Sequence, residues 1–283
     1  MNARSIFCYE EFYSYAIFVL AIDGNAFLRN GNPSLPSVRP SSRVCIASFN
    51  DWGKMACNVL SADFLPPPGT TGPKQRITSA SRDLFLNQAG TCVREVAGVL
   101  NEAECSAWLS WAERNAFNPA SHGPGSGLAR RECSRLVIDD ASLAGMLWAR
   151  VMPYAPKVAG RRAVGCLPLV RVYRYDVGQQ FAKHVDASTT APSFSGTSST
   201  EATVLLYLNS AGEAAGGGEA GLQGGETVFY KGKLGTKRLC AVVPRAGVAV
   251  LHTHGDRCLL HAGAKVTCGT KFLLRTDIVY DDE

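Results

Sequence analysis

The chain has 283 residues, of which 46% are hydrophobic and 19% are charged, and its formal net charge is +5. These values exclude an intrinsically disordered chain and fit one large folded domain or two small ones. Lys and Arg are scattered without a run longer than two residues. We therefore expect no nucleic-acid partner.

The first 90 residues show little periodicity. Asn30–Ser42 is rich in Pro, Ser, Gly and Asn, and Pro66–Gly69 opens a second segment rich in residues that break helices and strands. We predict a poorly ordered N-terminal extension over residues 1–90, with one short helix near Phe7–Leu20. The folded domain is predicted to span residues 91–283.

Two helices are predicted at the start of this domain. Asn101 and Glu104 have the spacing of an N-cap residue and its capping-box partner, and apolar residues at helical spacing follow them. The second helix begins after Asp139-Asp140, has one apolar face and is stopped by Pro153.

Short β-rich runs separated by turns make up the rest of the chain. This pattern predicts a mainly β fold with flanking helices: a jelly-roll (double-stranded β-helix) core with helices packed on one sheet. The low-complexity segment Ala211–Gly224 is predicted to be a flexible insertion. The predicted strands are Leu167–Tyr175, Ala202–Leu208, Thr227–Phe229, Leu239–Val243, Val248–Leu251, Cys258–His261 and Lys271–Tyr280.

The cysteines and the N-terminal apolar segment bear on the compartment. Ten cysteines are spread from Cys8 to Cys268 without a CxxC pair or a Cys/His spacing typical of zinc, and no N-glycosylation sequon is present. We therefore favour the cytoplasm. Phe12–Ile22 is too short to span a membrane as a helix, and Glu10 and Glu11 precede it where a signal peptide has basic residues. The secretory pathway is the alternative.

A candidate metal site begins with His184 and Asp186. On an extended strand, side chains at i and i+2 point to the same face and can serve one ion. His261, at the end of a β-like run, is the best third ligand. Two histidines and one carboxylate leave open positions on an octahedral ion, which suits non-haem iron(II) that must bind an organic co-substrate and oxygen.

A co-substrate with a second carboxylate also needs a cation. Lys271 and Arg275 lie on the last predicted strand, four residues apart and therefore on the same face. Either side chain can form a charge-assisted hydrogen bond to a carboxylate. Both remain candidates at this point.

Several motifs resemble those of one enzyme family. Leu169–Asp186 (LVRVYRYDVGQQFAKHVD) resembles the YxxGQxFxxHxD segment of prolyl-4-hydroxylase-like 2-oxoglutarate oxygenases. Leu260–Tyr280 is similar to their HxGxxVxxGxKxxLRxDxxY pattern. The resemblance covers roughly Val93 to Tyr280, because three more segments follow in the family's order: Val204–Asn209 (VLLYLN), Gly224–Phe229 (GGETVF) and Val243–Gly247 (VPRAG).

The resemblance implies a role for particular residues. It makes His184, Asp186 and His261 the iron ligands and Lys271 the partner of the distal 2-oxoglutarate carboxylate. It also places Tyr175 in the co-substrate pocket and implies a dependence on ascorbate. We expect Thr203 and Tyr207 to line the barrel as well. His252 and His254 are interpreted as supporting or loop histidines and not as ligands.

These observations predict an iron(II)- and 2-oxoglutarate-dependent dioxygenase that hydroxylates a substrate C–H bond and releases succinate and CO2. The expected substrate is a protein or peptide, with peptidyl proline first, or a small molecule. Two alternatives stay open: a cupin-type metal enzyme that does not use 2-oxoglutarate, and a catalytically silent jelly-roll binding module. The cupin alternative would leave Lys271 without a purpose, and the silent module would not need the complete ligand set.

Overall fold

The computed structural model describes residues 17–21, 44–49, 55–60, 80–121, 129–191, 194, 197–212, 221–232 and 234–282. The chain divides into two units, Met1–Leu65 and Pro66–Glu283. In the first unit the described residues form an antiparallel sheet of β1 (Ile17–Ala21), β2 (Val44–Phe49) and β3 (Met55–Leu60), in that order.

This sheet corrects one prediction for the N-terminal segment. Ile17–Leu20 belongs to strand β1, so the helix predicted near Phe7–Leu20 is wrong over these residues. Apolar β-branched and aromatic residues make Ile17–Ala21 a good strand, and pairing with β2 decides in its favour. Residues 7–16 lie outside the described residues, as does most of the predicted poorly ordered extension.

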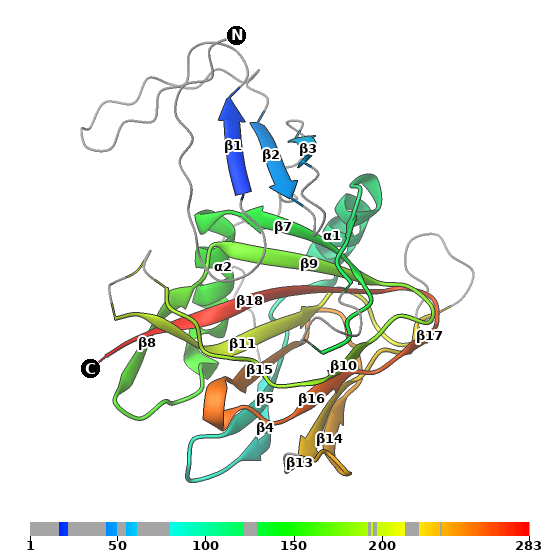
Figure 1. The fold of residues 1–283 in the computed structure, drawn as a ribbon. Helices are drawn as coiled ribbons and strands as arrows, with labels where there is room; N and C mark the ends of the chain where they lie inside the picture. Colours follow the sequence, from blue (N-terminus) through cyan, green and yellow to red (C-terminus); the bar gives the residue numbers. More distant parts are fainter. Residues whose placement is uncertain are drawn as a thin grey trace, which may run out of the picture. The chain divides into compact units, whose positions relative to one another are not determined.

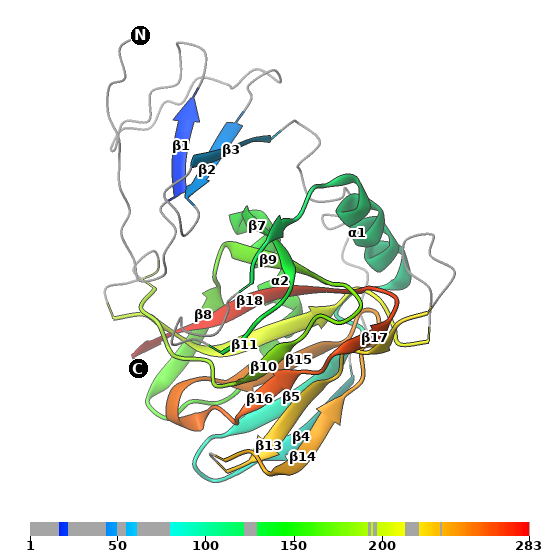
Figure 2. The same ribbon diagram turned by 45° about the vertical axis from the view of Figure 1, so that its right-hand side comes forward.

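In its described residues, the second unit contains two main antiparallel sheets and one short strand pair, and it is mainly β (Figures 1 and 2). The larger sheet has the strand order β4-β5-β15-β11-β18-β9-β7-β6, and β8 also pairs with β18. Its strands are β4 (Ala80–Leu86), β5 (Cys92–Ala97), β6 (Asn118–Pro119), β7 (Ser134–Asp139), β8 (Arg161–Cys166), β9 (Leu169–Tyr175), β11 (Ser199–Tyr207), β15 (Ala249–Thr253) and β18 (Lys271–Asp282).

The smaller sheet has the order β10-β16-β13-β14, and a separate short pair is formed by β12 and β17. A hydrophobic core lies between the two sheets, because one buried cluster combines Tyr173 and Tyr207 of the larger sheet with Phe229 and Val242 of the smaller one. This arrangement is the predicted jelly roll. The remaining strands are β10 (Phe181–His184), β12 (Gln223–Gly224), β13 (Thr227–Lys231), β14 (Lys237–Val242), β16 (His261–Gly263) and β17 (Val266–Cys268).

The edge of the larger sheet differs from the predicted domain boundary. Strand β4 pairs with β5 in register from Ala80↔Ala97 to Leu86↔Cys92, so it belongs to the core domain although it precedes residue 90. The structure divides the chain after Leu65. The strand was missed because its pattern ASRDLFL alternates poorly, and only the partner strand β5 stabilises it.

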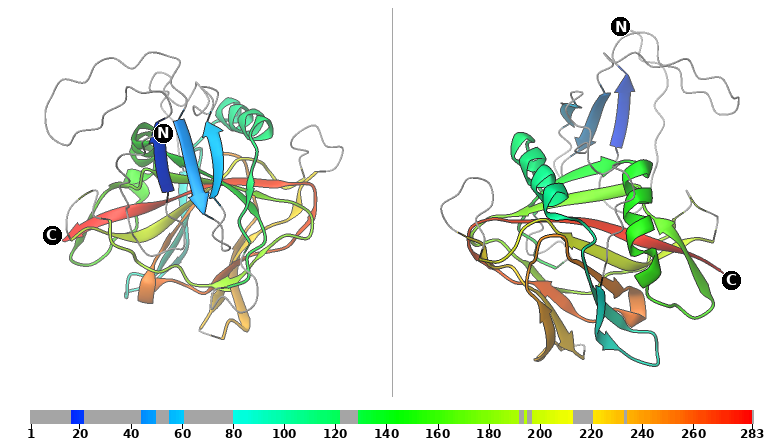
Figure 3. Two further views of the ribbon diagram at one scale, coloured as in Figure 1. Left: turned by 45° about the horizontal axis from the view of Figure 1, so that its top comes forward. Right: turned by 180° about the vertical axis from the view of Figure 1, so that it is seen from behind.

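Two helices accompany the larger sheet (Figure 3). α1 (Glu102–Arg114) begins with the predicted capping box between Asn101 and Glu104, and α2 (Ala141–Val151) begins at Asp140, whose carboxylate accepts two backbone N–H bonds. α2 packs against β8 and β9. An ion pair of 2.7 Å between Arg150 of α2 and Glu104 of α1 links the helices.

The segment before β16 is not the strand that the sequence predicts. A 3-10 turn, η3 (Gly255–Arg257), ends with the backbone N–H of Cys258 bonded to the carbonyl of Gly255, and the strand begins only at His261. Gly255 has a positive φ of 60°, which favours glycine at this turn. A second 3-10 turn, η2 (Met152–Tyr154), contains the predicted helix stop at Pro153.

Among the described residues, neither helix has the length and hydropathy needed to cross a membrane.

Candidate metal centre

Strand pairing brings two of the predicted ligands together. β10 ends at His184, and this residue is the cross-strand partner of His261 at the start of β16. Directly opposite residues on neighbouring antiparallel strands are in contact distance, and the two imidazole centroids lie 4.2 Å apart. The ring of Phe181 stacks on His184 with centroids 3.6 Å apart and holds its orientation. Asp186 follows two residues after His184.

Backbone carbonyls fix the tautomer of both histidines. The Nδ1 atom of His184 lies 2.8 Å from the carbonyl oxygen of Ala182, and Nδ1 of His261 lies 2.9 Å from that of Leu259. Because a carbonyl oxygen can only accept a hydrogen bond, each Nδ1 must carry the proton. The Nε2 lone pairs are therefore free to bind a metal, which is how histidine ligands are commonly oriented.

Both Nε2 atoms face the carboxylate of Asp186. The Nε2 atom of His184 is 3.7 Å from Oδ1, and Nε2 of His261 is 3.8 Å from Oδ2. The three side chains each offer a ligand atom, and these atoms all lie within 4.8 Å of one another. Two imidazoles and one carboxylate fit an iron(II) centre that leaves positions open for a co-substrate and oxygen.

The electrostatic surroundings keep this set ready for a cation. Burial, and then the neighbouring His261, lower the pKa of His184 to about 3, and burial also lowers the pKa of His261, so both imidazoles are neutral. Burial alone would raise the pKa of Asp186. Arg275 and the nearby histidines outweigh that effect and hold the pKa of Asp186 well below its usual range, so the carboxylate is ionised.

Asp186 is held by a buried polar network. Its Oδ2 atom accepts a hydrogen bond from the Thr203 hydroxyl at 2.8 Å and lies 3.1 Å from the Arg275 guanidinium. Thr203 also contacts Nε2 of His254 at 2.7 Å, and Arg275 lies 3.3 Å from Asp277. Buried networks of this kind fix a ligand's orientation when all members are satisfied. The interpretation of His254 as a supporting histidine agrees with these contacts.

Lys271 lies at the other end of the same pocket. Its side chain is buried, and the ammonium donates a hydrogen bond to the carbonyl oxygen of Gly225 at 2.5 Å. It lies over the rings of Tyr175 and Tyr207, 5.6 Å and 5.2 Å from their centroids. Burial lowers the pKa of Lys271 to about 7, with Glu226 acting in the opposite direction.

Two glycines of the segment Gly224–Thr227 (GGET) allow the carbonyl of Gly225 to approach the ammonium of Lys271. Gly225 has a φ of 72°, and a Cβ at this position would lie 3.0 Å from Cδ of Lys271. At Gly224 a Cβ would lie 2.2 Å from the carbonyl oxygen of Lys265, which no side chain can tolerate. Glycine at both positions therefore allows the backbone to lie close to Lys265 and Lys271 at the pocket wall.

The structure gives different surroundings to the two candidate cations. Arg275 is already near two carboxylates, Asp186 and Asp277, and these raise its pKa although burial acts to lower it. Among the described residues, Lys271 forms no ion pair. Tyr175 is buried beside Lys271, and burial raises its pKa well above the usual value, so its hydroxyl stays protonated.

All six predicted site residues line one pocket: His184, Asp186, His261, Lys271, Tyr175 and Arg275. The pocket has about 530 Å³ of space not filled by protein atoms, including its open mouth. The predicted barrel-lining residues Thr203 and Tyr207 are both buried, at Asp186 and at Lys271 respectively.

Sequence reasoning missed the contributions of Asp277 and Phe181. Asp277 could have been found from strand alternation, because it lies two residues after Arg275 on β18 and therefore faces the same side. Phe181 occupies the F position of the YxxGQxFxxHxD-like motif, but its stacking on His184 depends on an irregular register between the two residues, which the motif does not reveal. The predicted flexible insertion at Ala211–Gly224 lies mostly outside the described residues, since 213–220 are not described.

The family model of the 2OG-Fe(II) oxygenase superfamily matches residues 170–276, a range that includes all six predicted site residues. Residues 170–276 are therefore the part of the chain that matches a 2OG-Fe(II) oxygenase. The match confirms the predicted superfamily and enzyme class, and the two packed sheets confirm the predicted jelly-roll core. Iron(II) and 2-oxoglutarate are the cofactor and co-substrate of this class. No curated protein is similar enough in sequence to count as a relative of this oxygenase.

Solved structures similar to this oxygenase include prolyl hydroxylases. A viral collagen prolyl hydroxylase from Paramecium bursaria Chlorella virus-1, in complex with 2OG, is 21% identical, with a TM-score of 0.42 over 66% of this chain and 95% of the viral one. A Pseudomonas putida prolyl-4-hydroxylase is 16% identical, with a TM-score of 0.44 over 68% and 92%. A Trichoplax adhaerens prolyl hydroxylase, in complex with a hypoxia-inducible-factor peptide, is 14% identical, with a TM-score of 0.48 over 68% and 84%.

Proposed function

We propose that this oxygenase hydroxylates a C–H bond of its substrate, with His184, Asp186 and His261 as the iron ligands. The net reaction converts R–H, 2-oxoglutarate and O2 into R–OH, succinate and CO2. The observation that carries the proposal is the arrangement of two Nε2 atoms around one ionised carboxylate, at one end of a pocket that has a buried lysine at its other end.

Bound iron supplies the redox chemistry, and the chain's own residues supply geometry and charge. The carbonyls of Ala182 and Leu259 keep the two imidazoles in the tautomer that a metal needs. Thr203 and Arg275 hold Asp186 in place. Buried aromatic and aliphatic side chains around the pocket limit the access of water.

Lys271 is proposed to bind the distal carboxylate of 2-oxoglutarate. Its ammonium is buried, lies in the same pocket as the three ligands and has no anionic partner within ion-pair distance among the described residues. Arg275 is proposed to serve Asp186 instead, because its guanidinium is already engaged with Asp186 and Asp277. Tyr175 is proposed to form part of the co-substrate wall beneath Lys271.

Peptidyl proline is the proposed substrate, on the strength of the YxxGQxFxxHxD-like and HxGxxVxxGxKxxLRxDxxY-like motifs. The same fold and ligand set serve other substrates, so the substrate has to be found by experiment. Ascorbate is proposed as the reductant that sustains turnover. A protein or peptide substrate fits a pocket that has an open mouth.

The experiment measures succinate released by the purified chain with iron(II), 2-oxoglutarate and ascorbate, with and without a panel of proline-rich peptides. We expect a slow release without peptide and a faster one with the right peptide, both lost on chelation. Product analysis by mass spectrometry should show one added oxygen atom on the peptide.

The His261→Ala variant separates this proposal from a non-enzymatic binding module. Succinate release that survives in this variant would contradict the metal assignment. No release from a folded, iron-loaded protein with any substrate would favour the silent module.

A further inference from the structure

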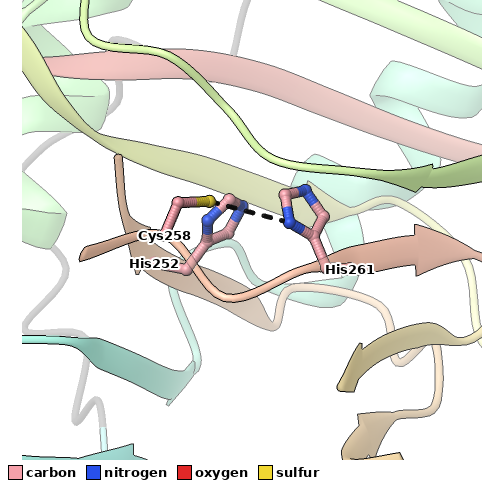
Figure 4. Close-up of side chains that lie close together, drawn as sticks. All are labelled: His252, Cys258 and His261. Atoms are coloured by element: carbon pink, nitrogen blue, oxygen red, sulfur yellow. Dashed lines mark hydrogen bonds between the residues drawn. The ribbon is translucent and has the colours of Figure 1, made fainter. Parts of the chain in front are cut away.

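A second group of metal-binding side chains overlaps the proposed iron site. His252, Cys258 and His261 each offer a ligand atom, and these atoms all lie within 4.8 Å of one another. Figure 4 shows the three side chains turned toward one another from β15, from the turn before β16 and from β16 itself. The Sγ atom of Cys258 lies 3.8 Å from Nδ1 of His261, and because that nitrogen donates to the carbonyl of Leu259, the lone pair that His261 offers to a metal is on Nε2.

The buried and unpaired imidazole of His252 indicates that a ligand can bind here. Its side chain is 1% exposed, and neither ring nitrogen has a hydrogen-bond partner among the residues that the structure describes. The nearest acidic atom, Oδ2 of Asp186, is 3.6 Å from Nε2, which is beyond a normal hydrogen bond. A buried polar group without a partner is costly, so a ligand at this position would remove a penalty that the fold otherwise carries.

We propose that His252, Cys258 and His261 form a second site, which takes a thiophilic divalent ion such as zinc in competition with iron at His184, Asp186 and His261.

The chemistry of the donor atoms distinguishes the two sets. The first set contains nitrogen and oxygen donors, whereas the second replaces the carboxylate by a cysteine thiol. Thiolate ligands favour zinc, and three protein ligands with one open position are a common zinc arrangement. Coordination removes the thiol proton, which passes to solvent when the metal binds.

His261 makes the two sites exclusive. A neutral imidazole carries one lone pair, so it can bind only one ion at a time. Its ring lies between the other two imidazoles, with centroids 4.2 Å from His184 and 4.5 Å from His252. An ion held by His252 and Cys258 therefore withdraws His261 from iron, which makes the oxygenase sensitive to zinc.

The set was not predictable from sequence spacing. His252 lies on β15 of the larger sheet and His261 on β16 of the smaller sheet, and Cys258 lies just after the η3 turn. The fold brings them together from three separate elements. The backbone N–H of Asp186 donates to Sγ of Cys258 at 3.2 Å, which places the sulfur beside the iron ligands.

The test uses cobalt(II) as a spectroscopic probe on the full, metal-free and reduced chain. A thiolate bound to cobalt gives a near-ultraviolet charge-transfer band that nitrogen and oxygen ligands do not give. We expect this band in the wild-type protein and its loss on addition of zinc. Absence of the band would overturn the proposal, and this readout does not depend on turnover.

Variants assign the band to the proposed ligands. We expect it to disappear in Cys258→Ser and in His252→Phe, which keeps the ring shape but removes the ring nitrogens. It should remain in Cys268→Ser, a matched control on β17, because the chain has ten cysteines that could bind cobalt. A band that persists in Cys258→Ser would overturn the proposal.

His184→Ala separates the second set from the first. We expect the cobalt–thiolate band to remain in this variant, because His184 belongs only to the iron set. Loss of the band would mean that Cys258 merely joins the iron site, and the second site would be refuted. Circular dichroism shows whether each variant is folded, and Cys258→Ala provides a second substitution if Cys258→Ser is not.

Zinc competition provides an independent readout. Zinc binding measured by titration should weaken about tenfold or more in Cys258→Ser, since even partners behind the ligands change metal affinity by that much. Unchanged zinc affinity in Cys258→Ser would contradict the assignment.

Discussion

The two ends of the pocket differ in how their charges are balanced. At the metal end, the carboxylate of Asp186 lies 3.1 Å from the Arg275 guanidinium and accepts a hydrogen bond from Thr203 at 2.8 Å. At the other end, the ammonium of Lys271 meets the carbonyl of Gly225 and two tyrosine rings, and no ion pair is formed in the described part of the chain.

This difference shows at which end of the pocket the protein's own residues neutralise the buried charge. A buried charge is costly without a partner, and the lowered pKa of Lys271 records that cost. Asp186, in contrast, has a pKa well below its usual range because cationic and histidine neighbours compensate for burial. The metal end is therefore organised before ligands bind, whereas the lysine end, under the proposed function, would gain its counter-ion from the co-substrate.

The largest expected effect is at the metal end. His184→Ala and Asp186→Ala each leave only two protein ligands, so iron-dependent succinate release should be abolished while the fold is kept. His122→Ala, a histidine outside the described residues and outside every motif, serves as the control. Unchanged succinate release in either ligand variant would contradict the assignment of these residues as metal ligands. Succinate assays and circular dichroism on the same samples provide both measurements.

A smaller effect is expected at the lysine end. Lys271→Met keeps a side chain of similar length but removes its charge. One charge-assisted hydrogen bond to the 2-oxoglutarate carboxylate, of roughly 1.5–3 kcal/mol, is therefore lost. The half-saturating 2-oxoglutarate concentration should rise about 10- to 100-fold. Lys265→Met, at an exposed lysine nearby, is the matched control. An unchanged requirement in Lys271→Met would transfer the role to Arg275.

The pH dependence of co-substrate binding sharpens the same comparison. The pKa of Lys271 is lowered to about 7 by burial, so its charged form is present below pH 7 and is lost as the pH rises. The affinity for 2-oxoglutarate should therefore fall above pH 7, by up to about tenfold for each pH unit. Lys271→Arg, which stays charged, should flatten the profile. A flat profile in the wild-type protein would contradict the assignment of Lys271.

How much of this arrangement is readable from the sequence depends on the range of the interactions. Alternation along one strand puts Lys271 and Arg275 on the same face, and a local capping signal places the start of α1 at Asn101. Local features of this kind can be predicted because they depend only on residues close together in the sequence.

Long-range features were beyond that reasoning. The pairing of His184 with His261 is set by the register of β10 against β16, which only the folded sheet defines. The burial of His252 without a partner likewise results from the packing of both sheets around it. The turn at Gly255–Arg257 shortened a predicted strand because its backbone bonds are satisfied locally.

The smallest expected effect concerns Thr203, which supports Asp186 without facing the co-substrate. Its fully buried hydroxyl contacts Asp186 at 2.8 Å and His254 at 2.7 Å. Thr203→Val preserves the shape but removes one hydrogen-bond partner from each of those buried groups, which costs about 1–3 kcal/mol of unfolding free energy. Iron(II) affinity should fall about tenfold, because partners of a metal ligand typically contribute that much.

Thr200→Val is the matched control for this prediction. Thr200 is equally buried on the same strand, but its hydroxyl bonds to Thr189 and not to the site. Both variants should lose stability in thermal unfolding, whereas only Thr203→Val should lose iron affinity, and neither should change the 2-oxoglutarate affinity set by Lys271. An equal loss of iron affinity in the two variants would mean that general loosening of β11, and not the orientation of Asp186, governs the metal end.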